Sequence, residues 1–117
     1  MIVVGIDTSC YTTSVAAAGK DGIICSCCKL LPVPPGTRGL RQSEAVFAHI
    51  RQLPDVYGQA LSSLKGTVPQ AVCVSVSPRD GSDSYMPVFR TGLSFARVLA
   101  DTWQVPLLTT THQRGHV

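Results

Sequence analysis

Two histidines near the end of the sequence have the spacing of a metal-ligand pair. His112 and His116 flank the stretch HQRGH, at positions i and i+4. On a helix these positions share one face, so both imidazoles can reach a single divalent cation. Two ligands do not complete a site, and the neighbouring residues offer no third one. Two surface or helix-capping histidines would show the same spacing, so the pair alone leaves both interpretations open.

A second group of polar residues follows the first apolar run. Asp7, Thr8 and Ser9 place a carboxylate beside two hydroxyls at a tight turn. Such a turn suits a nucleotide phosphate and its Mg²⁺, because hydroxyls and backbone amides hold phosphate oxygens while a carboxylate holds the cation, often through water. A plain hairpin turn favours the same residue types. The sequence therefore leaves two interpretations of this turn: a nucleotide-binding site or an ordinary hairpin turn.

A third polar stretch, Ser77–Ser84 (SPRDGSDS), precedes a predicted helix. Gly81 and Ser82 lead towards the helix N-terminus, where backbone amides and the helix dipole favour an anion. The stretch lacks the glycine spacing and the Lys-Ser/Thr ending of a P-loop. Asp80 and Asp83 would also repel a phosphate. An ordinary surface loop is the favoured interpretation.

Hydrophobic patterning predicts the elements that must position these residues. Strands are expected where β-branched runs end at turn formers, and helices where apolar residues recur at helical spacing. Pro87 fits the first turn of a helix, whereas Pro54 interrupts a helical pattern and predicts a kink or a break near Leu53. The predicted strands are Ile2–Asp7, Thr12–Ala18, Ile23–Leu31, Gln70–Ser77 and Val105–Thr109; the predicted helices run from about Ser43 to Gly66 and over Pro87–Trp103, and another begins at His112.

The order of these elements predicts an α/β fold. Three consecutive antiparallel strands followed by α/β crossovers is the ribonuclease-H-like order of the actin-like ATPase domain, with a mixed five-stranded sheet flanked by helices. Actin, Hsp70 and the sugar kinases pair two such domains around a nucleotide cleft. Residues 1–117 account for one of them. We therefore expect an N-terminal lobe, with the C-terminal lobe absent from this sequence.

Composition excludes several classes of protein. Apolar residues make up 44% of the chain and charged residues 15%, which suits one globular domain and not a disordered chain. The apolar runs are too short to cross a bilayer, and the N-terminus lacks the basic start of a signal peptide, so a cytoplasmic protein without membrane contact is expected. The net charge of +3 permits an acidic partner such as tRNA, but the basic residues are scattered and do not indicate one.

The remaining chemically active side chains favour structural roles. The five cysteines are odd in number, and CSCC (Cys25, Cys27 and Cys28) is not a zinc-knuckle spacing, so reduced cysteines buried in strands are expected. His49 lies within a predicted helix beside apolar residues. A packing or capping histidine is the favoured interpretation for it.

Three segments together resemble one known family, the glycoproteases (O-sialoglycoprotein endopeptidases), which are also the tRNA N6-adenosine threonylcarbamoyltransferases. The opening GIDTSCYTTSVA (Gly5–Ala16), the helix segment GLSFAR (Gly92–Arg97) and the end VPLLTTTHQRGH (Val105–His116) are each similar to a family motif. EAVFAH (Glu44–His49) is a weaker match. The resemblance spans the whole chain, and the combination of segments is more specific than any one of them.

The resemblance implies a function for the intact protein. It implies a metal- and nucleotide-dependent acyl transferase, in which His112, His116 and a carboxylate of the C-terminal half hold Zn or Fe, and ATP with Mg²⁺ binds near Asp7, Thr8 and Ser9. The implied partners are the missing C-terminal lobe and other tRNA-modification proteins. This chain alone is expected to be inactive and to self-associate through the surface that the missing lobe would cover.

The same comparison leaves alternatives open. Tyr11 and Thr12 stand where the family carries an acidic pair, which indicates a divergent paralogue and favours a non-catalytic partner or scaffold of a true transferase. The N-terminal lobe of a sugar or acetate kinase is a third interpretation, since Asp7 and Thr8 also suit the opening strands of those enzymes. Peptidase chemistry is not indicated, because HQRGH lacks the glutamate of the HExxH motif.

Overall fold

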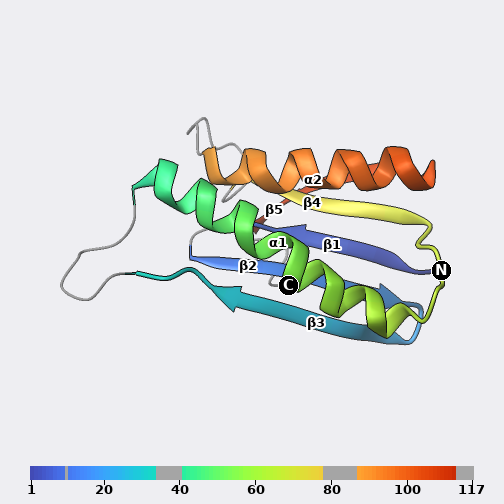
Figure 1. The fold of residues 1–117 in the computed structure, drawn as a ribbon. Helices are drawn as coiled ribbons and strands as arrows, with labels where there is room; N and C mark the ends of the chain where they lie inside the picture. Colours follow the sequence, from blue (N-terminus) through green and yellow to red (C-terminus); the bar gives the residue numbers. More distant parts are fainter. Residues whose placement is uncertain (10, 34–40, 78–86, 113–117) are drawn as a thin grey trace.

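The computed structural model describes residues 1–9, 11–33, 41–77 and 87–112. These residues form a five-stranded mixed sheet in the order β3-β2-β1-β4-β5 (Figure 1). The first three strands are antiparallel, and β4 and β5 run parallel to β1, as predicted. The elements are β1 (Val3–Asp7), β2 (Thr12–Gly19), β3 (Gly22–Leu30), α1 (Gln42–Leu64), β4 (Ala71–Ser77), α2 (Pro87–Trp103) and β5 (Leu107–Thr111).

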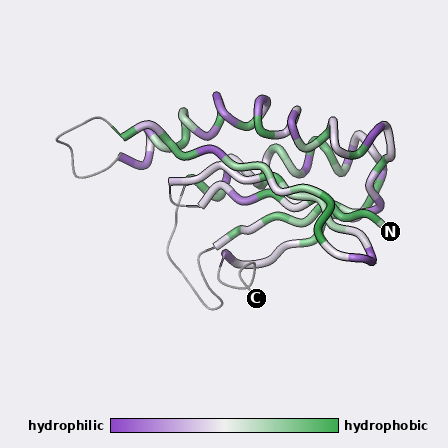
Figure 2. The backbone as a smooth tube through the Cα atoms, turned by 90° about the horizontal axis from the view of Figure 1, so that it is seen from below, coloured by the Kyte–Doolittle hydropathy of each residue, from purple (hydrophilic) through white to green (hydrophobic). Residues whose placement is uncertain are grey.

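Alternating side chains give the sheet one apolar face. Ile6 of β1 pairs with Val15 of β2 on one side and with Val74 of β4 on the other, and all three are buried. Successive residues of a strand point to opposite faces, so the pairing places these side chains in one layer. Figure 2 shows the contrast in hydropathy between the mostly apolar strands and the helices, which alternate between polar and apolar residues.

Both helices cover that apolar face. Leu53 and Val56 of α1 and Ala96 of α2 belong to the same buried cluster as the inward-facing strand residues. Figure 1 shows α1 and α2 on the same side of the sheet, so no described helix covers the opposite face. The alternate residues of β1 and β2 that face away from the helices are partly exposed. In the described part of the chain, no helix is long and apolar enough to cross a membrane.

The structure corrects two details of the predicted elements. The predicted break near Leu53 does not occur: α1 is one continuous helix that contains Pro54, because Leu53 and Val56 on either side of the proline are both buried in the core. Such packing outweighs the loss of one backbone hydrogen bond. The last strand begins at Leu107 and not at Val105, because the Val105 amide donates to the Ala100 carbonyl and closes the end of α2.

The buried polar groups on the helix side have structural partners. His49 is fully buried, and its Nδ1 lies 2.8 Å from the Thr13 hydroxyl. This agrees with the predicted packing role. The four cysteines among the described residues all lie on strands as free thiols, but none is fully buried as predicted: Cys25, Cys27 and Cys73 are partly buried, and Cys28 is exposed. Cys28 pairs with Ser14 on the edge strand β3 and faces the side of the sheet away from the helices.

Candidate functional site

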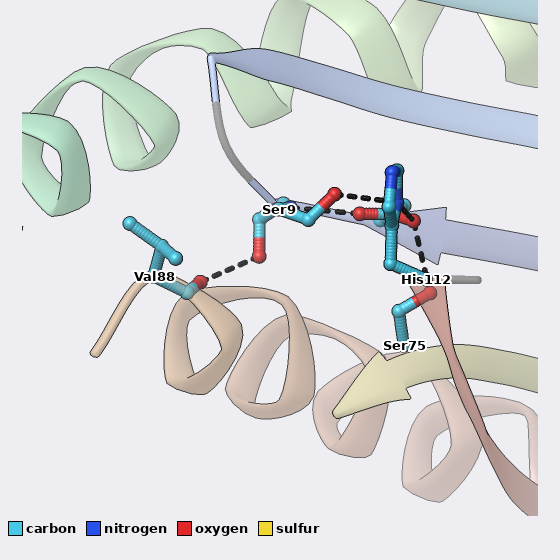
Figure 3. A network of polar contacts seen from close by, with 6 residues as sticks. Ser9, Ser75, Val88 and His112 are labelled. Carbon is cyan, nitrogen blue, oxygen red and sulfur yellow. Dashed lines mark hydrogen bonds and ion pairs between the residues drawn. The ribbon is translucent and has the colours of Figure 1, made fainter. Parts of the chain in front are cut away.

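Asp7 and His112 meet at one edge of the sheet. Asp7 ends β1 and His112 directly follows β5, and both strands run parallel to β4, so their carboxyl ends reach the same edge. Ligands in open α/β sheets bind outside the carboxyl ends of the strands. The Asp7 Oδ2 atom lies 2.8 Å from His112 Nδ1, and Ser9 Oγ lies 2.7 Å from the same nitrogen. Figure 3 shows this network.

Two further groups hold the Asp7 carboxylate. The Ser9 amide donates to Oδ1 over 2.7 Å, and the Ser75 hydroxyl of β4 donates to Oδ2 over 3.0 Å (Figure 3). Sequence reasoning did not single out Ser75. The feature that indicates it is a hydroxyl between two valines near the carboxyl end of a strand, where ligands bind in such sheets. A buried hydroxyl at such a position needs a partner, and the partner is Asp7.

The surroundings of Asp7 keep it ionised. Burial is the largest influence and by itself would raise the pKa of Asp7. The hydrogen bonds to Ser9, His112 and Ser75 together outweigh burial and hold this pKa below its ordinary value. At neutral pH the side chain is therefore a carboxylate that can only accept hydrogen bonds.

The cluster borders a hollow on the uncovered face of the sheet. The hollow has a volume of about 600 Å³, and Asp7, Ser9, Ser75 and His112 line one end of it. Its floor consists of small residues at outward-facing strand positions, which leave room above the sheet: Gly5, Ser14, Ala16 and Cys73. The dimensions suit a small ligand such as a nucleotide.

The Thr8 side chain points away from the hollow and contacts α2. Its side chain is fully buried, and its hydroxyl donates to the Val88 carbonyl over 2.6 Å and accepts from the Gly92 amide over 3.1 Å. These bonds tie the end of β1 to α2. Of the three residues predicted to bind a nucleotide, Asp7 and Ser9 line the hollow, whereas the Thr8 hydroxyl is engaged by α2.

The second predicted metal ligand, His116, lies outside the described residues, as does most of the loop Ser77–Ser84. Within residues 1–9, 11–33, 41–77 and 87–112, no three metal-ligating side chains converge. His112 nevertheless suits a metal ligand, because metal-bound histidines commonly donate their other ring nitrogen to a carboxylate, as His112 is placed to do with Asp7. The described residues thus contain one candidate ligand, His112, and a carboxylate, Asp7, in contact with it.

Solved structures with a similar fold identify the class of domain. YeaZ from Pseudomonas aeruginosa superposes with a TM-score of 0.67 at 15% identity, covering 94% of this chain and 42% of that one. RuvC from T. thermophilus, solved with a Holliday junction substrate, gives a TM-score of 0.52 at 16% identity, covering 95% and 64%. The chain therefore has the α/β fold that was predicted, the ribonuclease-H-like fold that actin-like ATPase domains also share.

Curated relatives identify the family that the sequence resembles. The tRNA N6-adenosine threonylcarbamoyltransferases of Methanopyrus kandleri and Thermosipho melanesiensis are 34% and 33% identical to it, and both alignments cover the whole chain. The chain spans about a third of the length of each relative, 33% and 35% respectively. No family model matches the sequence. These matches confirm that the chain is related along its whole length to the tRNA N6-adenosine threonylcarbamoyltransferases.

Proposed function

We propose that this chain forms the metal- and nucleotide-binding lobe of a protein that transfers a threonylcarbamoyl group to adenosine in tRNA. The contact between Asp7 and His112 is the observation that carries the proposal, because it joins the two predicted sites into one. The hollow beside this contact supports it, since a nucleotide lying there would bring its phosphates next to Ser9 and His112. The family relationship supports the choice of reaction.

In this proposal each residue has a separate role. His112 binds Zn or Fe together with His116 and a carboxylate from the remainder of the protein. The ion, when bound, supplies positive charge that stabilises phosphate oxygens during acyl transfer. The Ser9 hydroxyl contacts a phosphate. Asp7 orients His112, because its oxygens already accept bonds from Ser9, Ser75 and His112.

The proposed reaction is an acyl transfer from an adenylate. The adenosine N6 forms a bond to the threonylcarbamoyl carbonyl carbon, the bond from this carbon to the adenylate phosphate oxygen breaks, and AMP leaves. The proton lost from N6 passes to solvent or a base. Nothing in this scheme requires peptide hydrolysis.

A non-catalytic paralogue that supports a true transferase is the second candidate function. Tyr11 and Thr12 favour it, because they stand where the resembled family carries an acidic pair. Thr12 lines the hollow, so a carboxylate at this position would have lain beside the proposed nucleotide. In that case the hollow would bind a nucleotide without turnover.

An assay of tRNA product separates the two functions. A full-length protein that contains this chain, given threonylcarbamoyl-adenylate and unmodified tRNA, is expected to form threonylcarbamoyladenosine, measured by mass spectrometry of nucleosides. His112→Ala is expected to lower the rate by about 100-fold or more, since even outer-shell residues of metal sites carry effects of about 10- to 100-fold. Ser62→Ala, on the exposed side of α1, is the control. Absence of product from the wild-type protein would favour the non-catalytic paralogue.

The proposed function includes other parts of the protein and separate partner proteins. We propose that a further lobe closes over the hollow and that tRNA-modification proteins bind the assembled molecule. For self-association of this chain alone we propose a different surface from the one expected from the sequence: a groove of about 650 Å³ between α1 and α2, on the helix side of the sheet, which is lined in part by Ile50, Phe95 and Val98. Ile50 and Val98 are large apolar side chains that are more than half exposed. Exposed apolar patches of this kind mark sites of association.

A further inference from the structure

We propose that Asp7 is a positioning residue that holds His112 in one tautomer, with the proton on Nδ1, so that Nε2 is the nitrogen that binds the metal. This inference deepens the proposed function and rests on it for the presence of a metal. It assigns to Asp7 a role that differs from the cation or phosphate contact expected from the sequence.

The distances determine the tautomer. The Asp7 Oδ2 atom is 2.8 Å from His112 Nδ1, and an ionised carboxylate can only accept hydrogen bonds. Nδ1 must therefore carry a hydrogen, since two lone pairs at this distance would repel each other. Ser9 Oγ, 2.7 Å from the same nitrogen, then serves as a second acceptor. In a neutral imidazole that donates from Nδ1, the lone pair lies on Nε2.

The carboxylate is itself held in place. The Ser9 amide donates to one oxygen and the Ser75 hydroxyl to the other, so rotation of the Asp7 side chain would break both bonds. Ser75 belongs to β4, which lies between β1 and β5 in the sheet. The orientation of His112 therefore depends on three adjacent strands. A rigid sheet edge fixes a ligand better than a flexible loop does.

Nitrogen NMR tests the tautomer without any metal. Long-range proton–nitrogen spectra of the metal-free chain at mildly alkaline pH report which ring nitrogen of His112 carries the proton. The wild-type chain is expected to show His112 protonated on Nδ1. Asp7→Asn is expected to shift His112 towards the Nε2-protonated form, because the new amide can donate to Nδ1. Asp7→Glu should restore the wild-type form, and Ser62→Ala should not change it.

Zinc affinity tests whether the position of His112 that Asp7 sets matters for metal binding. In a full-length protein that contains this chain, and with it all the proposed ligands, competition with a coloured chelator is expected to show that Asp7→Asn weakens Zn²⁺ binding by about 10- to 100-fold, as for other outer-shell partners of metal-bound histidines. His112→Ala should remove the site. Circular dichroism confirms folding of each variant. If Asp7→Asn does not fold, Ser75→Ala is measured in its place, and a smaller loss of Zn²⁺ affinity is expected.

The tautomer measurement and the Zn²⁺ affinity measurement test different claims, so one can be contradicted while the other stands. An Nε2-protonated His112 in the wild-type chain, or a tautomer that Asp7→Asn leaves unchanged, would overturn the positioning role. A tautomer that responds to Asp7 while Zn²⁺ affinity is the same in all variants would overturn the metal site of the proposed function and leave the tautomer assignment standing.

Discussion

Replacement of Gly92 by alanine is expected to lower the free energy of unfolding by about 2–4 kcal/mol, through overpacking and the loss of a buried hydrogen bond. An added Cβ atom would lie 2.8 Å from Thr8 Oγ1 and 3.5 Å from Ile6 Cγ2. Thr8 is a short, branched and fully buried side chain, so it cannot move aside. Either α2 shifts away from β1, or the Thr8 hydroxyl loses its bonds to the Val88 carbonyl and the Gly92 amide.

Urea denaturation monitored by circular dichroism measures this loss. Gly58→Ala is the matched control, because Gly58 also lies within a helix but is exposed and would have nothing within 4 Å of the added Cβ. This control is expected to gain about 0.5–1 kcal/mol, since alanine is the better helix former. A Gly92→Ala variant as stable as the control would show that the approach of α2 to β1 is not tight.

Thr13→Val is expected to cost about 2–4 kcal/mol although it conserves the side-chain shape. The Thr13 hydroxyl donates to Gln52 Oε1 over 3.0 Å and accepts from His49 Nδ1 over 2.8 Å. All three side chains are buried. Valine withdraws a partner from two buried polar groups at once, and each such loss costs about 1–3 kcal/mol.

Thr12→Val provides the comparison for this change. Thr12 is the preceding residue on the same strand, and its side chain lines the hollow on the uncovered face. Its substitution is expected to change stability by no more than about 0.5 kcal/mol, as is usual for partly exposed positions without a special role. Equal denaturation midpoints for the Thr12 and Thr13 variants would contradict the structural role of the buried network.

Local patterns in the sequence were sufficient to determine most of the elements. The β-branched run that begins at Ile2 and ends at the turn formers Thr8 and Ser9 marked β1, and Pro87 marked the first residue of α2, because these signals act within a few residues of the chain. Asp7 and Ser9 could also be recognised as candidates from the polar turn after the first apolar run, and His112 from its spacing with His116. The class of fold followed from the order of strands and helices.

Only the tertiary structure decided how these residues combine. His112 and Asp7 are 105 residues apart, and they meet because β4 lies between their strands in the sheet. The same arrangement brings in Ser75, which carries no recognisable motif, and turns Thr8 away from the hollow towards α2. Hydrophobic periodicity reports which face of a strand is buried, but not which distant strand lies beside it. That choice depends on the packing of the whole sheet against both helices, and it determines which of the candidate residues share a site.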